Sequence, residues 1–199
     1  MNTTSGTEGK GRRSAGLAGR VTWAIDPVRS RLLFALRHII VHQIRGSFAR
    51  WGGTIALDER DPARSRVDVW IDLASVDTGD PARDDHVRSA EFFDVARFPQ
   101  ATFASVEIRT SEGPVAVVRG RLDLHGVGED LDVEIVDQAR STDPDGRERC
   151  TFTVKTRFDR RRFGLRWNQD LDVGGVVVGD IIEIEAHVEA VRLPERRES

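Results

Sequence analysis

Apolar and polar residues alternate along most of the chain, with the period of two that is typical of half-buried β-strands. The clearest run is 66–73, where valine, isoleucine and leucine alternate with aspartate and tryptophan. A long stretch punctuated by glycines extends to Leu57, and the remaining alternating runs are 21–26, 31–38, 102–109, 118–125, 131–135, 152–159 and 182–190. Turn residues separate most of these runs, so the pattern predicts about eight strands.

One face of each predicted strand is apolar and the other is polar, which is the pattern of an antiparallel sheet. A sandwich and a closed barrel both satisfy it. The strands are long and interrupted by glycine, and closure removes exposed edges, so we favour the barrel. We predict an all-β domain over 21–192 with one or two short helices, a disordered polar tail at 1–20 and a charged tail at 193–199.

One connection, 77–103, breaks the alternation and concentrates charge, a histidine and aromatic residues. Asp84 and Asp85 suit the first turn of a short helix, because the helix dipole favours carboxylates there. The aromatic residues that follow are Phe92, Phe93, Phe98 and Phe103. At least two of these rings are expected in the core. The pattern predicts a short helix and an aromatic plug that close one end of a barrel holding an apolar ligand.

The histidines divide into two groups. His125 and His187 fall in the polar phase of their strands and are expected at the surface. His38 continues an apolar phase, so it either bonds the backbone at the barrel rim or donates to the polar head of a ligand. His38 and His42 are four residues apart, but they lie in a strand pattern and no acidic residue or cysteine completes a metal site.

The segment from Arg83 to His86 combines two carboxylates with a histidine, which suggests acid–base chemistry. A structural role is the simpler explanation, because the carboxylates fit a helix start. The sequence also contains no Gly-x-Ser-x-Gly, Gly-x-x-x-x-Gly-Lys or Cys-x-x-Cys motif. We therefore expect no enzymatic activity, no metal and no cofactor.

Composition limits the partners. The chain has 39% hydrophobic and 32% charged residues with a net charge of −3, which gives no reason to expect nucleic acid or an anionic membrane as partner. Cys150 is the only cysteine, so no internal disulfide forms, as in reducing compartments. Residues 1–20 lack the apolar run of a secretory signal. We expect a cytoplasmic protein without stable membrane insertion.

Several segments together carry a family resemblance: Trp23–Asp26, Ser30–Phe34 with His38, Arg45–Phe48, Ser75–Gly79, Arg83–Ser89, Phe92–Val95, Phe98–Pro99, Gly120–Leu122, His125–Val127, Asp159–Arg160 and Phe163–Gly164. On these segments the chain resembles the YceI family of lipocalin-like proteins, regarded as polyisoprenoid-binding. The resemblance implies an eight-stranded antiparallel barrel whose lumen takes a long isoprenoid chain, such as a quinone tail or a polyprenyl lipid. It also implies a homodimer. The chain departs from the family at Arg29, where histidine is usual, and at Gly128, where threonine is frequent.

From these patterns and the resemblance, the expected ligand-binding residues are Phe34, Leu36, His38, Arg83, Asp84, His86, Phe92, Phe93, Phe98, Phe103 and Phe163. Of these, His38, Arg83 and His86 would meet the polar head. Three hypotheses follow. The first is non-catalytic storage or carriage of an isoprenoid lipid. The second is a lipid isomerase or cyclase that uses the same lumen. The third is a stress-related interaction protein whose barrel is filled by its own side chains.

Overall fold

The computed structural model describes residues 20–38, 42–58, 60–110, 115–168 and 178–194. The tails predicted at 1–20 and 193–199 lie almost wholly outside the described residues, and the first strand begins at Arg20. Eleven strand segments form one antiparallel sheet. Their bounds are β1 Arg20–Ile25, β2 Arg31–His38, β3 His42–Phe48, β4 Trp51–Asp58, β5 Arg66–Asp72, β6 Val76–Asp77, β7 Gln100–Thr110, β8 Ala116–Leu124, β9 Val127–Thr142, β10 Glu148–Asp159 and β11 Val178–Arg192.

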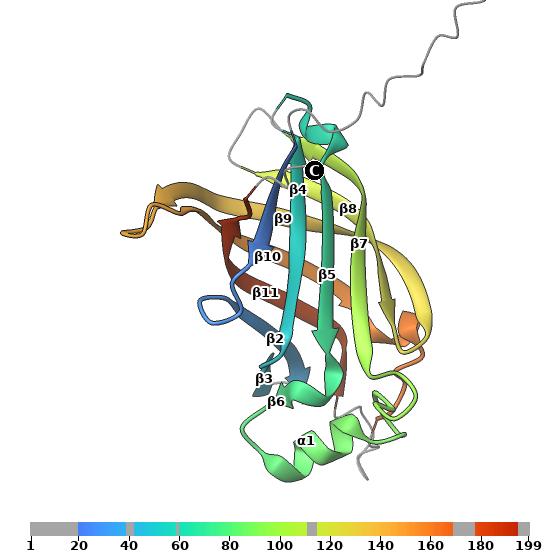
Figure 1. The fold of residues 1–199 in the computed structure, drawn as a ribbon. Coiled ribbons are helices and arrows are strands. Elements are labelled where there is room, and N and C mark those ends of the chain that lie inside the picture. Colours follow the sequence, from blue (N-terminus) through green and yellow to red (C-terminus); the bar gives the residue numbers. More distant parts are fainter. Residues whose placement is uncertain (1–19, 39–41, 59, 111–114, 169–177, 195–199) are drawn as a thin grey trace, which may run out of the picture.

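Three pairs of these segments behave as single interrupted strands. The end of β11 pairs with β1 and its beginning pairs with β2, so β1 and β2 lie along the same edge. In the same way β3 and β4 lie against β2 and β1, while β6 and β5 lie against β3 and β4. Joining each pair gives a closed barrel of eight antiparallel strands, as predicted. Figure 1 shows the strands wrapped around one interior.

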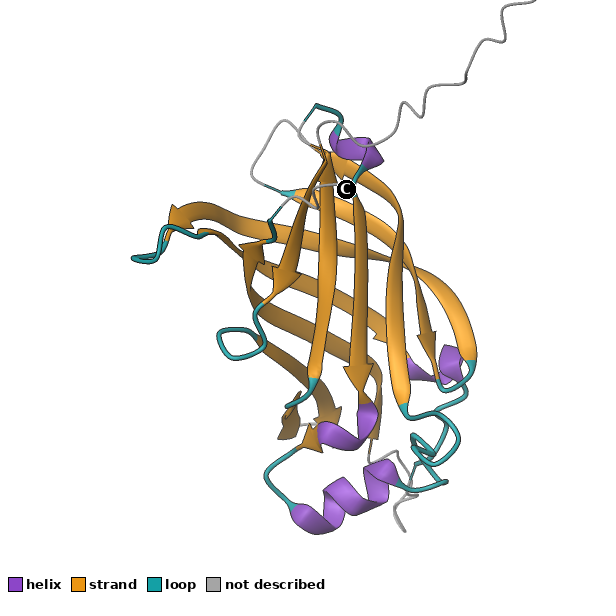
Figure 2. Cartoon of the chain, in the orientation of Figure 1, coloured by secondary structure: helices purple, strands orange, loops and turns teal. Residues whose placement is uncertain are grey.

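Every strand of the barrel pairs with its neighbours in sequence, and the barrel closes where β11 meets β1 and β2. The helical elements lie at the ends of the barrel (Figure 2). They are η1 Pro62–Arg64, η2 Leu73–Ser75, α1 Pro81–Arg88 and η3 Arg160–Phe163. The predicted short helix is α1, which lies across one end of the barrel in Figure 1. We call this the α1 end.

Alternation places apolar side chains inside along most strands, but β7 changes phase. Phe103 points into the barrel, and the pairing with β8 shifts between Ser105 and Glu107. As a result Ile108 also lines the interior, although Val106 is 62% exposed on the outer surface. A bulge inserts one residue into one strand, which exchanges the inward and outward positions beyond it. The alternating run predicted over 102–109 therefore does not present one apolar face along its whole length.

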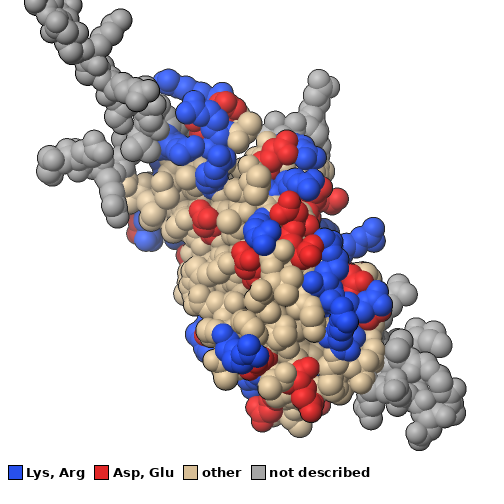
Figure 3. All heavy atoms as spheres, turned by 90° about the vertical axis from the view of Figure 1, so that its right-hand side faces the viewer, with Lys and Arg blue, Asp and Glu red and all other residues tan. Residues whose placement is uncertain are grey.

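The outer surface carries charges of both signs. On the face shown in Figure 3, basic and acidic side chains are interspersed. Ion pairs such as Arg119 with Asp130 and Arg121 with Asp123 account for part of this arrangement. The pattern is that of a solvated surface, and each exposed pair contributes little to stability.

The β9–β10 hairpin extends beyond the rest of the barrel (Figure 1), and Arg149 anchors its base. Arg149 is only 6% exposed, yet it reaches three carboxylates: Asp143 at 2.9 Å, Asp26 at 3.2 Å and Glu189 at 2.6 Å. Asp143 also accepts the Arg147 backbone N–H, and this bond, together with Arg149, lowers the pKa of Asp143 to about 2. We call this group the Arg149 cluster.

Candidate functional site

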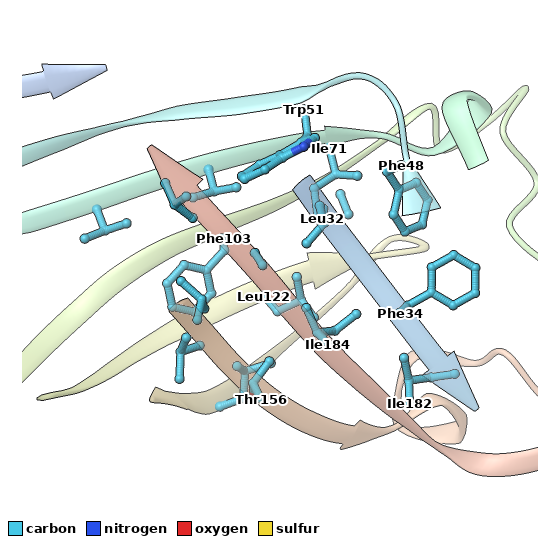
Figure 4. Close-up of a pocket in the computed structure, with 18 of the residues that line it drawn as sticks. Leu32, Phe34, Phe48, Trp51, Ile71, Phe103, Leu122, Thr156, Ile182 and Ile184 are labelled. Carbon is cyan, nitrogen blue, oxygen red and sulfur yellow. The ribbon is translucent and has the colours of Figure 1, made fainter. Parts of the chain in front are cut away.

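The interior of the barrel holds a cavity of about 700 Å³. Figure 4 shows Trp51, Phe103 and Leu122 among the side chains that point into it from different strands. Leu32 and Ile184 face it from β2 and β11. The lining is almost wholly apolar, so the described side chains leave a lumen and do not fill the barrel. Cavities of this size and character are typical small-molecule sites.

Two glycines make room for aromatic rings along the wall. A Cβ at Gly46 would collide with the ring of Phe34 and would lie 2.8 Å from the Asp77 carbonyl oxygen. A Cβ at Gly120 would collide in the same way with the ring of Phe103. These glycines therefore let the two rings lie flat over the sheet. That role differs from the bends that glycines in a barrel strand usually suggest.

The α1 end is held by contacts between side chains and the main chain. Asp80 caps α1 by accepting the N–H groups of Ala82 and Arg83. Asp84 is buried, and its Oδ1 accepts from the Thr78 N–H at 2.9 Å and from the Thr78 hydroxyl at 2.6 Å. Asp84 does not line the cavity. Its geometry is that of a structural residue that fixes the turn before α1.

Arg83 lines the cavity, and two of its nitrogens already donate to Thr78. Its Nε donates to the Thr78 hydroxyl at 2.8 Å and its Nη2 to the Thr78 carbonyl at 2.9 Å. On the next turn of α1, Arg88 donates to the carbonyls of Ala74 and Val76. These bonds attach the helix to η2 and β6.

His86 is the residue of α1 that keeps a buried nitrogen without a partner among the described residues. Its Nδ1 lies 3.3 Å from a carboxylate oxygen of Glu91, and its ring lies 4.3 Å from the ring of Trp167. Its Nε2 is buried without a hydrogen-bond partner among the described residues. His86 and Trp167 both line the cavity. A buried polar atom without a partner costs free energy, so His86 is held here by the packing around it and not by a full set of hydrogen bonds.

Arg160 positions Trp167. Arg160 is fully buried, and its guanidinium donates to the main-chain carbonyls of Leu165, Trp167, Val178 and Gly179 at 2.6–3.2 Å. Burial lowers the pKa of Arg160 from its usual value, with Asp180 at 3.5 Å opposing this effect. The side chain thus satisfies carbonyls that the irregular segment after η3 would leave unpaired. The alternation pattern gave no indication of this role.

The structure separates the remaining predicted site residues into two groups. Phe34, Leu36, Phe92, Phe93 and Phe103 line the cavity. Phe98 and Phe163 do not.

Phe98 packs against His125, with ring centroids 4.8 Å apart. Phe163 is 1% exposed and packs edge-on against Phe158 at 5.2 Å. The pairing of β9 with β10 ends at Glu134 and Lys155. The 3-10 helix η3, which carries Phe163, also contacts β9. Phe163 therefore belongs to the core that supports the wall.

The prediction that His125 lies free at the surface is wrong. His125 occupies the turn after β8 with a φ of 53°, and it is half-buried. Its Nδ1 lies 3.2 Å from the Phe163 carbonyl oxygen. His187 is exposed, as predicted.

The predicted contact of His38 is not described. His38 is the last residue of β2 and pairs with Val178 and His42, but its side chain lies outside the described part of the structure. Among the described residues no cluster of three or more His, Cys, Asp and Glu could hold a metal ion. Within the same residues, no helix is long and apolar enough to cross a membrane.

Trp23 lines the cavity from β1, the strand that lies toward the end opposite α1 in Figure 1. It belongs to β1, is 2% exposed, and its Nε1 is buried without a partner among the described residues. The Arg140 guanidinium lies over its ring, 5.7 Å from the ring centroid. Cys150 lines the cavity nearby, and burial raises the pKa of its thiol. The alternating run predicted over 21–26 includes Trp23 as one of its apolar positions, but an alternation pattern says nothing of an unpaired nitrogen.

Comparison with known proteins shows which family this barrel belongs to. The family described as the YceI-like domain matches residues 23–190. The chain belongs to the YceI family. "Protein YceI" from Salmonella newport is 35% identical over 152 residues, which cover 76% of this chain and 78% of that protein. The family assignment and the eight-stranded barrel expected from the resemblance are therefore confirmed.

Solved structures of YceI-like proteins share the fold. BcnA from Burkholderia cenocepacia superposes with a TM-score of 0.70 at 25% identity, covering 83% of this chain and 98% of that chain. A protein from Saccharophagus degradans, described as a polyisoprenoid binding domain implicated in plant cell wall breakdown, superposes with a TM-score of 0.62 at 17% identity. That alignment covers 86% of this chain and 98% of the other. At this identity the second similarity concerns the fold alone.

Proposed function

We propose that this YceI-family protein binds a long-chain isoprenoid lipid in its lumen and stores or carries it without changing it chemically. The observation that carries the proposal is the apolar cavity of about 700 Å³ inside the barrel. An isoprenoid tail offers apolar surface and almost no hydrogen-bonding atoms, so it suits such a lumen. Each buried CH₂-sized group contributes roughly 0.8 kcal/mol before the cost of ordering the chain. The polyisoprenoid described for the Saccharophagus degradans relative is consistent with this ligand class.

In this proposal the tail lies along the apolar lining, which includes Phe34, Leu36, Phe92, Phe93 and Phe103. The polar end of a quinone or polyprenyl lipid lies near His86, with Arg83 beside it and His38 as a further contact. Asp84, Phe98 and Phe163 act behind the wall, because their present contacts are with the turn before α1, with His125 and with Phe158.

The direct test is native mass spectrometry of the purified protein, followed by solvent extraction and identification of what is released. We expect a stoichiometric isoprenoid species, either carried from the cell or acquired after incubation with quinones and polyprenyl lipids. A mass that stays that of the bare chain after incubation would contradict the proposal.

A matched pair of variants tests whether the lumen is the site. Ala186 is buried and lines the cavity, whereas Ala104 is exposed on the outer face of β7. Ala186→Phe fills part of the lumen and is expected to weaken lipid binding at least tenfold, while Ala104→Phe leaves it unchanged. If Ala186→Phe prevents folding, Ala186→Val gives the same comparison with less strain. Equal binding by the two variants would place the ligand elsewhere.

The alternative of a lipid-modifying isomerase or cyclase is supported by one observation, namely that His86 lines the cavity with Nε2 unpaired. The variant His86→Ala distinguishes a lipid carrier from a lipid-modifying enzyme. In a carrier it changes the affinity for the lipid, whereas in an enzyme it stops conversion of the bound lipid. Product analysis of extracted lipid after long incubation decides between them.

We also propose a cytoplasmic location and a homodimer. A chain with one cysteine forms no internal disulfide, which fits a reducing compartment. Cell fractionation tests the location, and light scattering after size-exclusion chromatography tests the dimer. Recovery outside the cytoplasm, or a monomer mass at all concentrations, would overturn the respective proposal.

A further inference from the structure

A column of uncharged side chains is exposed along one strand of the outer wall. On β7 these are Thr102, Ala104 and Val106. Trp70 of the neighbouring strand β5 pairs with Thr102 and is 43% exposed. On its other side Trp70 pairs with Gly52, so no side chain of β4 covers the ring at that position. We call Thr102, Ala104 and Val106, with the outward residues of β5 and β8 beside them, the β7 face.

The register of the sheet places opposite charges on the two sides of this column. Asp68 of β5 pairs with Ala104, and Ala104 pairs with Arg121 of β8. The three residues therefore form one row across three strands, and all of them are exposed. Within the described part of the chain the Asp68 carboxylate has no ion pair. Arg121 pairs with Asp123 at 3.6 Å, but more than half of each side chain is exposed.

This arrangement is complementary to itself. If a two-fold axis runs along β7 in the plane of contact, residues on the axis meet their own copies, and residues beside β7 on one subunit meet those on the other side of β7 in its partner. Thr102, Ala104 and Val106 suit the axis because none of them is charged. Asp68 then faces Arg121 of the partner subunit, and Arg121 faces Asp68 of the partner subunit. One row of the sheet thus supplies two ion pairs.

The neighbouring row fits the same axis. Trp70 pairs with Thr102, and Thr102 pairs with Asp123, so these residues are level with one another. Trp70 then faces Asp123 of the partner subunit. An indole N–H only donates and a carboxylate only accepts, so the two groups are complementary. Tryptophan and arginine are also the side chains that contribute most often to the centre of protein interfaces.

The row on the other side of Ala104 brings two arginines level, Arg66 of β5 and Arg119 of β8. Arg66 donates to the Ser65 carbonyl at 2.8 Å, and Arg119 pairs with Asp130 at 3.6 Å. Both side chains therefore have partners within their own chain and need none across the contact.

The mixture of charges favours a second copy over other partners. Figure 3, which views the side of the barrel at the right of Figure 1, shows uncharged surface among basic and acidic side chains. A nucleic acid or an anionic membrane is attracted by basic residues and repelled by carboxylates such as Asp68 and Asp123. A copy of the same face offers a partner of opposite charge to both Asp68 and Arg121.

We propose that a second copy of this chain docks on the β7 face, about a two-fold axis that runs along β7. The inference rests on the homodimer proposed above and adds the surface that forms it. Because this face belongs to the outer wall, lipid in the lumen takes no part in the contact.

The test exchanges the charges of the central row. In Asp68→Arg both new basic side chains face Arg121, and in Arg121→Glu both new acidic side chains face Asp68. We expect each variant to raise the dimer dissociation constant at least about tenfold, because two ion pairs become two repulsions. Sedimentation over a concentration series measures this constant. An equimolar mixture of the two variants restores opposite charges at both contacts and is expected to form a mixed dimer.

Glu183→Arg is the matched control. Glu183 is exposed on β11, which lies halfway around the eight-stranded barrel from β7. This variant is expected to dimerise like the wild type, and all the variants are expected to keep their lipid affinity. If the charge exchanges leave the dimer intact, or if the mixture stays monomeric, the inference fails and the homodimer stands. A wild type that is monomeric at all concentrations overturns both and leaves the face to a different partner.

A second measurement does not depend on charge. Ala104 lies on the proposed axis, so Ala104→Cys brings two thiols together in the dimer. In a chain that also carries Cys150→Ser, this is the only thiol. A short bis-maleimide reagent is expected to link two such chains, and Glu183→Cys in the same background is expected to stay unlinked. Equal linking of the two variants would overturn the inference.

Discussion

Two regions of this barrel bury an arginine, and they satisfy it in opposite ways. Arg160, at the α1 end, gives its donors to main-chain carbonyls. Arg149, at the base of the β9–β10 hairpin, gives its donors to three carboxylates. Burial lowers the pKa of Arg160, whereas the hydrogen bonds that Arg149 donates to Asp143 and Asp26 raise the pKa of Arg149. The region around Arg160 is thus held by hydrogen bonds to main-chain carbonyls. The region around Arg149 is held by ion pairs with carboxylates, whose charge depends on pH.

The difference matters for function because only the first region shapes the lumen. Arg160 holds the segment that carries Trp167, and the ring of Trp167 packs against the ring of His86 at a tilt of 59°. The Arg149 cluster lies on the outer side of the sheet and links the hairpin to Asp26 and Glu189. We therefore expect the two arginines to differ both in their effect on ligand binding and in their response to pH.

The largest expected effect is that of Arg160→Met. It leaves several buried carbonyls without a donor, which costs about 3 to 5 kcal/mol in the free energy of unfolding. Urea unfolding measures this loss, and lipid titration should show weaker binding because Trp167 is released. The control is Arg162→Met, whose exposed pair with Glu129 contributes about 0 to 1 kcal/mol. Similar losses in both variants would mean that Arg160 does not organise this end.

The next effect is that of Arg149→Met, which removes the buried cation that Asp143, Asp26 and Glu189 share. The more exposed Arg147 and Arg29 still pair with Asp143 and Glu189 and offset part of the repulsion. We expect lower stability near neutral pH and unchanged lipid affinity, since the cluster lies outside the lumen. Because carboxylates that repel one another gain by protonation, the stability deficit should shrink as the pH falls toward about 4. Melting temperatures of both proteins across this range measure the change. A deficit that stays constant would argue against charge repulsion.

The smallest expected effect is the loss of wild-type stability as the pH falls. The pKa of Asp143 is about 2 in the folded protein, below the value of about 3.9 in an unfolded chain. Its contribution to stability is therefore complete above about pH 4 and is lost as the pH falls toward about 2. Asp143→Asn should reduce the slope of stability against pH in this window. An unchanged slope would assign the acid response to other carboxylates.

The sequence predicted the fold well because the barrel is built from local alternation and the inward phase follows from a period of two. It failed in β7 because a bulge changes the phase inside one strand. Nothing in the sequence distinguishes Val106, which is exposed, from Ile108, which faces the cavity. A bulge depends on how two strands pair, and pairing is a property of the folded sheet.

The candidate site was only partly predictable. The sequence shows which residues are polar, but not how many of their donors are already used. Arg83 has partners on Thr78, and Asp84 accepts from the same residue, whereas His86 keeps one nitrogen unpaired. Trp167 and Arg160 were missed because they lie in an irregular segment, where no periodicity relates a residue to a side of the barrel.

The closure of the barrel has a consequence for how the protein is made. β11, the last strand, pairs with β1 and β2, the first strands. Contacts between neighbouring strands form early in synthesis, but the seam joins segments more than a hundred residues apart, and such long-range contacts form slowly. On the ribosome the seam stays open until the C-terminal strand emerges. The lumen therefore closes only after β11 has emerged, and its cargo is loaded after that point or trapped as this strand docks.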